Sequence, residues 1–148
     1  MTALAGFGDT FESDILQLIL NATPIANIAD NAASGPLTVL EIALHTADPT
    51  EAGAQNSSEC AYTGYARVPV NRNNSAKKWT VANPSTNVDA ITFGECTVGS
   101  ESATHFTIGT AHTGAGKVLA GGQLTAPLAI SPGITPSFAV GALSAALG

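Results

Sequence analysis

The chain has 148 residues, the usual length of one domain, and 45% of them are hydrophobic, enough for a packed core. Only 11% are charged, against about 25% in an average soluble domain, and the formal net charge is −6. This composition favours a subunit whose weakly charged surface is covered by copies or neighbours. An acidic chain without a basic stripe is a poor nucleic-acid binder, so no nucleic-acid partner is expected.

The N-terminal residues predict an arm followed by a helix. Residues 1–8 are small and apolar, with two glycines, and read as a flexible arm. Asp9 with Glu12 resembles a capping box, and the helix should run from Thr10 to Asn21, because Thr23-Pro24 disfavours continuation. One apolar stripe lies at helical spacing: Phe11, Ile15, Leu18 and Ile19, widened by Leu16 and Leu20. The N-terminus lacks the basic region of a signal peptide, and its apolar run is too short to span a bilayer.

After Pro24 the apolar period changes to two, which indicates strands. Leu40, Ile42 and Leu44 share the face of one strand. A second strand carries Ala66, Val68 and Val70 on one face, with Tyr65 and Arg67 opposite, and Pro69 inside it indicates an edge or a bulge. Further strand candidates are 79–82, 88–93, 105–110, 117–124, 128–130 and 138–147.

These elements predict a mainly β fold: a single jelly-roll-like β-sandwich of about eight strands, preceded by one amphipathic helix, over residues 9–148. The Ala-rich tail Phe138 to Leu147 has helical propensity, but its position after Pro136 favours a strand. No internal repeat or linker is visible in the sequence.

Four segments together resemble a known family. They are LEIALHTADPTEAGAQNSSECAYTGYARVPV at 40–70, ATHFTIGT at 103–110, GAGKVL at 114–119 and ISPGITPSF at 130–138. Their order and spacing resemble small virion proteins of tailed phages that are labelled tail fibre or minor structural protein. The resemblance implies a structural role in the virion, assembly in the host cytoplasm, and contacts with the major capsid protein or other virion proteins.

No residue pattern indicates catalysis, a cofactor or a metal site. His45, His105 and His112 lack short ligand spacing and read as strand or turn residues. Asp48, Glu51 and Glu59 share a polar loop that would be short of ligands for calcium, and Asp48-Pro49 reads as a turn starter. The stretch TGAGK at 113–117 lacks the full phosphate-loop spacing and reads as a hairpin turn. Cys60 and Cys96 are expected to be free thiols in a reducing cytoplasm, with a disulfide as the alternative.

The charges are unevenly distributed along the chain. The first 66 residues hold eight acids and no Lys or Arg, whereas the remainder holds five basic residues and three acids. The first interpretation is a solvated acidic face. The second is a complementary contact between acidic and basic regions of adjacent subunits. The first interpretation is preferred, because surface charge pairs usually contribute little to the free energy of association or folding.

The function predicted from the sequence is a non-enzymatic capsid decoration (cement) protein that stabilises the head as a homo-oligomer, most simply a trimer. Absence of repeats and long heptads favours decoration over a fibre shaft. Leu4 and Phe7 in the arm are the expected contacts with a neighbouring subunit or the shell. Two alternatives stay open: a neck, tail or tail-fibre component, and a carbohydrate-binding adhesion module. Glycan-binding measurements would distinguish the carbohydrate-binding module from a virion structural subunit.

Overall fold

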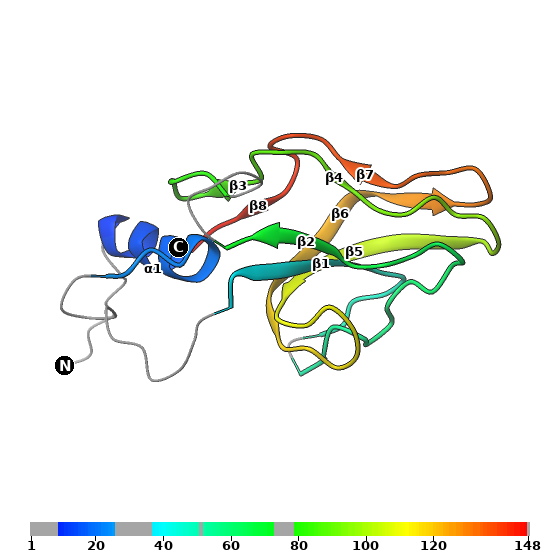
Figure 1. The fold of residues 1–148 in the computed structure, drawn as a ribbon, viewed down its shortest axis with the longest axis horizontal. Helices are drawn as coiled ribbons and strands as arrows, with labels where there is room; N and C mark the ends of the chain where they lie inside the picture. The colour runs from blue at the N-terminus through cyan, green and yellow to red at the C-terminus, as the bar shows by residue number, and fades with distance from the viewer. Residues whose placement is uncertain (1–8, 26–36, 51, 73–78, 148) are drawn as a thin grey trace, which may run out of the picture.

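A computed structural model describes residues 9–25, 37–50, 52–72 and 79–147, and Figure 1 shows their arrangement. One helix, α1, spans Asp9–Asn21. The strands are β1 Val39–His45, β2 Val68–Asn71, β3 Ser85–Thr86, β4 Ile91–Thr92, β5 Glu101–Gly109, β6 Val118–Ile130, β7 Ser137–Phe138 and β8 Ser144–Ala145. A mainly β architecture with an N-terminal helix, as predicted, is therefore confirmed. The described helix is too short to cross a membrane.

The central unit is an antiparallel four-stranded sheet in the order β2-β1-β5-β6. Its inner strand β1 pairs Ile42 with Val68 of β2 on one side and with Ile108 of β5 on the other. The predicted face of Leu40, Ile42 and Leu44 is buried, as expected. However, the opposite face of β1 is also buried, so β1 is covered on both sides rather than on one.

The two edges of this sheet differ. Strand β2 is four residues long and contains Pro69, which confirms the edge position predicted from that proline. At the other edge, the segments predicted as 117–124 and 128–130 form one continuous strand, β6, of 13 residues. Its pairing with β5 shifts register after Ala103 and after Ile108, so extra residues bulge from β6 at both places.

Helix α1 ends at Asn21 as predicted and begins one residue before the predicted start. Its buried face agrees with the predicted stripe only at Leu16 and Leu20. The most deeply buried side chains are Leu16, Gln17, Leu20 and Asn21, whereas Ile15 and Leu18 are half-buried and Ile19 packs on the core from the side. The Phe11 side chain lies outside the described part. The buried face is rotated from the predicted stripe because Gln17 and Asn21 hydrogen-bond the backbone of Thr80 and Trp79. The spacing of apolar residues does not predict such polar contacts.

The helix ends in a left-handed turn and an arginine cap. Ala22 has φ 53°, and the Thr23 N–H donates to the Gln17 carbonyl at 3.1 Å, so the chain turns back onto the last turn of the helix. The Arg72 guanidinium then donates to the carbonyls of Leu18, at 2.6 Å, and Ile19. A side chain beyond β2 thus supplies the positive charge that the last turn of α1 lacks.

The C-terminal third departs most from prediction. The expected strand at 138–147 is wrong in extent: it divides into β7 and β8, which pair with β4 and β3 as two separate two-stranded ribbons. The candidate at 79–82 contributes only an isolated bridge between Trp79 and Asn87. Within the described residues the strands thus group as four, two and two, and jelly-roll topology is not confirmed.

Side-chain amides explain why this region forms loops instead of a long strand. Asn87 donates from Nδ2 to the Ala139 carbonyl at 2.9 Å and accepts the Leu143 N–H at Oδ1 at 2.9 Å. Asn83 binds the N–H and carbonyl of Leu147 in the same manner, at 3.2 and 2.7 Å. These bonds satisfy the backbone without a ladder, and they bring the end of the chain next to α1 (Figure 1).

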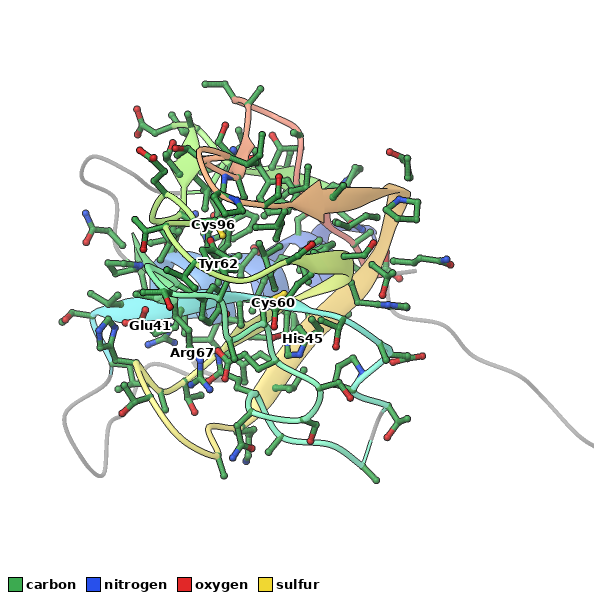
Figure 2. All side chains as sticks on the ribbon, turned by 90° about the vertical axis from the view of Figure 1, so that its right-hand side faces the viewer. Glu41, His45, Cys60, Tyr62, Arg67 and Cys96 are labelled. Atoms are coloured by element: carbon green, nitrogen blue, oxygen red, sulfur yellow. The ribbon has the colours of Figure 1, made fainter. Side chains whose placement is uncertain are left out.

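The core lies between the sheet and the C-terminal ribbons. Its aromatic part is a chain of ring contacts from Tyr62 through Tyr65, Phe93 and Phe138 to Phe106, with centroids 5.4 to 6.1 Å apart. Trp79 is fully buried beside α1. Figure 2 labels Cys60, Tyr62 and Cys96, which belong to this core.

Candidate functional site

The three histidines occupy different environments. His45 of β1 and His105 of β5 are directly opposite each other in the sheet, and His45 is fully buried while His105 is half-buried. His112 lies in the loop after β5, exposed, with its Nδ1 3.3 Å from Oε2 of the buried Glu41. The described residues hold no group of three or more His, Cys, Asp or Glu side chains arranged for a metal ion.

His45 is held as a neutral imidazole. Its Nδ1 lies 2.8 Å from the Ser57 carbonyl, an acceptor, so Nδ1 carries the proton. Its Nε2 lies 2.8 Å from Oγ1 of Thr107, whose hydroxyl therefore donates to the ring. Burial lowers the pKa of His45, and the nearby Ser57 carbonyl and Glu59 oppose that shift only in part.

A buried ion pair fixes the segment between β1 and β2. Arg67 donates from Nε to Glu59 Oε1 and from Nη2 to Oε2, both at 2.7 Å, a bidentate geometry. The Tyr65 hydroxyl donates to the same carboxylate at 2.8 Å and accepts the Leu44 N–H of β1 at 3.1 Å. The hydrogen bonds that Arg67 donates to Glu59 raise the pKa of Arg67, and burial raises the pKa of Tyr65. This arrangement has no exposed nucleophile or base and is structural.

The same arginine also holds the loop between β5 and β6. Its Nη1 and Nη2 donate to the carbonyls of Ala111 and Gly114, each at 2.7 Å. Gln55, fully buried, donates to the Glu41 carbonyl at 3.2 Å and accepts the Ala111 N–H at 2.9 Å. Gly114 has φ 74°, which confirms the predicted turn. In the sequence, Arg67 stands out because it is the first Lys or Arg of the chain, whereas no sequence feature indicates the role of Gln55 in holding this loop.

Both cysteines are buried and free, as expected for reduced thiols. Desolvation, reinforced by neighbouring Glu101, raises the pKa of Cys60 to about 12. The Glu101 carboxylate accepts the N–H groups of Ala61, at 3.0 Å, and Tyr62, at 3.2 Å. Cys96 lies 3.6 Å from the Val98 and Gly99 carbonyls. A protonated, buried thiol is unsuited to nucleophilic chemistry.

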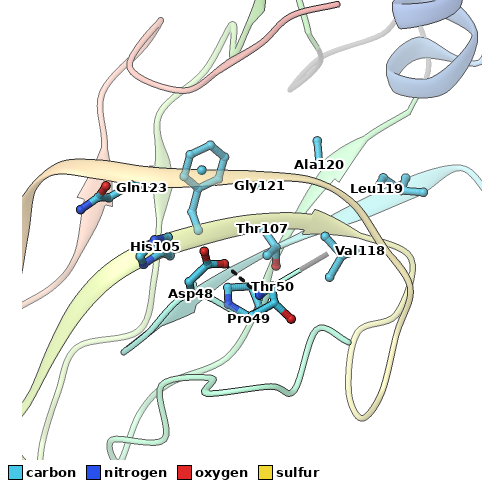
Figure 3. A pocket seen from close by; sticks show the side chains of 12 residues that line it. Asp48, Pro49, Thr50, His105, Thr107, Val118, Leu119, Ala120, Gly121 and Gln123 are labelled. Atoms are coloured by element: carbon cyan, nitrogen blue, oxygen red, sulfur yellow. Dashed lines mark hydrogen bonds between the residues drawn. The ribbon is translucent and has the colours of Figure 1, made fainter. Parts of the chain in front are cut away.

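A surface cavity is the strongest candidate for binding. It has a volume of about 470 Å³ and lies between the loop 48–50 and the strands β5 and β6. Figure 3 shows His105 and Gln123 toward one end and Val118 and Leu119 toward the other, with Asp48 and Thr50 between them. The turn predicted at Asp48-Pro49 is confirmed, since Asp48 Oδ1 accepts the Thr50 N–H at 2.8 Å.

The described surface carries few free cations. Arg67 is buried against Glu59, and Arg72 is committed to the carbonyls at the end of α1. Among the described residues this leaves Lys117 as the exposed basic residue, whereas Asp48, Asp89 and Glu95 are exposed acids. The expected interface residues Leu4 and Phe7 lie outside the described part of the chain.

A known protein family matches nearly the whole chain. Residues 8–146 match the family described as podophage GP4 fiber I protein gp80. The chain belongs to this family. It is therefore a structural protein of the phage virion, as its sequence segments had indicated. No curated protein matches the chain.

Proposed function

We propose that this protein is a non-enzymatic subunit of the tail-fibre apparatus of a podophage. The observation that carries the proposal is the match of residues 8–146 to a family described as a fiber protein. The sequence alone favoured capsid decoration, because a shaft was not evident. A compact fibre subunit needs no shaft of its own, so the family description moves our preference to the fibre.

The chemistry of the described side chains supports a binding role rather than catalysis. The buried thiol of Cys60 has a raised pKa, and His45 is neutral and bonded at both ring nitrogens. Glu59 and Arg67 neutralise each other in a bidentate pair. These buried groups are therefore occupied in holding strands and loops together.

Capsid decoration remains the second candidate, favoured by the short helix of 13 residues and by two-stranded ribbons instead of an elongated repeat. Labelling virions with gold-conjugated antibody against this protein separates the two positions. Gold at the tail is expected; gold spread over the head would support decoration. Quantitative mass spectrometry gives the copy number, hundreds for a head lattice and tens or fewer for a tail.

We also propose that copies associate with one another, and the edge of β6 is a suitable surface. Its 13 residues contain no Lys, Arg, Asp or Glu to discourage pairing with another strand. Pro127 lacks an N–H, so pairing with a second copy is expected along residues 118–126 of this edge. The trimer expected from the sequence and the arm 1–8 with Leu4 and Phe7 belong to this proposal. Light scattering of the purified protein over a range of concentrations measures the stoichiometry, and a monomer throughout would contradict it.

A further inference from the structure

The surface cavity beside β6 has the size and lining of a small-ligand site. Its volume of about 470 Å³ falls within the roughly 300–1,000 Å³ of such sites. Its polar groups come from separate parts of the chain: Asp48 and Thr50 from the loop, His105 from β5 and Gln123 from β6. Beside them lie apolar Val118, Leu119 and Ala120.

Local hydrogen bonds constrain the loop 48–50, which forms one wall. Thr50 is a β-branched residue with φ 62°, a backbone angle that such residues rarely adopt without support. Its N–H is bound by Asp48 Oδ1 at 2.8 Å, and its carbonyl accepts the Gly53 N–H at 3.1 Å. A Cβ on Gly53 would lie 1.8 Å from the Pro49 carbonyl oxygen, so this packing requires glycine.

The opposite wall is equally fixed. The Nδ1 of His105 lies 2.9 Å from Oγ1 of Thr104, which leaves Nε2 for a ligand. Behind it, the Thr107 hydroxyl is held by His45 at 2.8 Å. At Gly121 a Cβ would lie 2.8 Å from the Phe106 carbonyl oxygen, so the strand backbone stays uncovered by a side chain at this point. Donors and acceptors held in advance lower the ordering cost of binding.

The lining selects the class of ligand by its charges. It contains no Lys or Arg, and its carboxylate Asp48 would repel an anion. A single carboxylate is too few ligands for a divalent cation. An entirely apolar ligand would leave Asp48, His105 and Gln123 without water or partners. An uncharged molecule with many hydroxyl groups and an apolar C–H face is neither an anion, nor a divalent cation, nor entirely apolar, and therefore fits this lining.

We propose that this cavity binds an uncharged sugar unit, N-acetylated sugars included, of a surface polysaccharide, with Asp48 and Gln123 bonding its hydroxyl groups and Val118 and Leu119 contacting its C–H face. The inference rests on the proposed fibre function for the source of the sugar. The binding itself is a property of the isolated domain and is measured without the virion.

The test is a titration of the ¹⁵N-labelled full-length protein, followed by NMR, with methyl glycosides of glucose, galactose and N-acetylglucosamine. Methyl glucuronoside serves as the anionic probe. We expect saturable shifts confined to residues 48–50, 105–107 and 118–123 with at least one uncharged glycoside, and weaker binding of the glucuronoside. No saturable shift with any glycoside, shifts elsewhere, or tighter binding of the glucuronoside would each overturn the proposal.

Two variants sharpen the test. Asp48→Asn and Gln123→Ala should each raise the Kd about tenfold, the factor expected for one lost hydrogen bond. Glu95→Gln, which neutralises an exposed carboxylate outside the cavity, should leave the Kd unchanged. Because Gln123 is an exposed strand residue, its variant remains informative even if Asp48→Asn disturbs the loop. Equal affinity in Gln123→Ala and the parent would contradict the assignment.

A third measurement identifies the source of the sugar. Polysaccharide extracted from host cells should displace the bound glycoside, whereas failure to displace it would restrict the site to free sugars. Antibody labelling at the head would remove the fibre assignment without altering the titration, and a negative titration would leave the fibre assignment intact.

Discussion

Asn21, the last residue of α1, pairs with the backbone of Trp79 as a neighbouring strand would. Its Nδ2 donates to the Trp79 carbonyl at 3.1 Å, and its Oδ1 accepts the Trp79 N–H at 3.3 Å. Both residues are buried, and Gln17 adds a bond to the next carbonyl, Thr80, at 3.2 Å. Two polar side chains of the helix thus fix the position of α1 on the core.

Asn21→Ala should lower the free energy of unfolding by about 2 kcal/mol, because it leaves a buried N–H and carbonyl without partners. Urea denaturation followed by tryptophan fluorescence measures the loss, since Trp79 is the single tryptophan of the chain. Asn56→Ala, at an exposed loop position, is the matched control and should change stability by less than about 0.5 kcal/mol. Equal stabilities for the two variants would contradict the role of Asn21.

Arg67→Met should destabilise the fold by about 3–5 kcal/mol, because it leaves the Glu59 carboxylate and two loop carbonyls without their donor. Lys117→Met removes an exposed cation of similar length and is the control. Thermal denaturation of both gives the comparison. If Arg67→Met loses no more stability than Lys117→Met, the ion pair does not hold the loop.

Stability should fall as the pH drops below about 6.5, the usual pKa of an unfolded histidine. Burial lowers the pKa of His45, so below pH 6.5 the unfolded chain takes up a proton that the folded chain does not, which favours unfolding. The loss of stability stops increasing below the pKa of His45 in the folded protein, which is lower than 6.5. His45→Gln should reduce this slope, measured by urea titrations at several pH values between 5 and 7.5; an unchanged slope would show that another group is responsible.

Neither cysteine should react with Ellman's reagent at pH 8 while the protein is folded. Both thiols are buried, and the pKa of Cys60 is raised to about 12, so the reactive thiolate is scarce. Both should react fully in denaturant. Rapid modification of one thiol in the native protein would reveal an opening of the core around it.

Deletion of residues 1–7 should leave the melting temperature unchanged and weaken attachment to the virion. Leu4 and Phe7 would each contribute roughly 1.5–3 kcal/mol if buried at an interface. Binding of the truncated and full-length proteins to particles that lack this protein is compared by co-sedimentation, with Leu4→Ser/Phe7→Ser as a full-length counterpart. Undiminished attachment would exclude the arm as the anchor.

Local signals in the sequence predicted the parts of the fold that local chemistry decides. The end of α1 followed from Pro24, the edge position of β2 from Pro69, and the turn at Asp48 from its short side chain. The second buried face of β1 could not be predicted from a period of two. Its polar residue His45 is satisfied by Thr107, 62 positions away.

The candidate site shows the same limit. Asp48 and Gln123 come from a loop and a distant strand, and no short motif relates them. The loops of the C-terminal third depend on Asn83 and Asn87, whose amides replace strand ladders with individual bonds. A single asparagine in a sequence does not reveal which backbone it will bind.

The inward placement of Arg67 and Arg72 has a kinetic consequence. Where the described exterior approaches another negatively charged surface, the two repel at long range, and the Debye length of about 10 Å at 0.1 M salt sets the reach of that repulsion. The association rate constant with such a surface should therefore increase with ionic strength, the reverse of encounters steered by opposite charges. Media poor in salt would slow the first contact even when the final complex is stable.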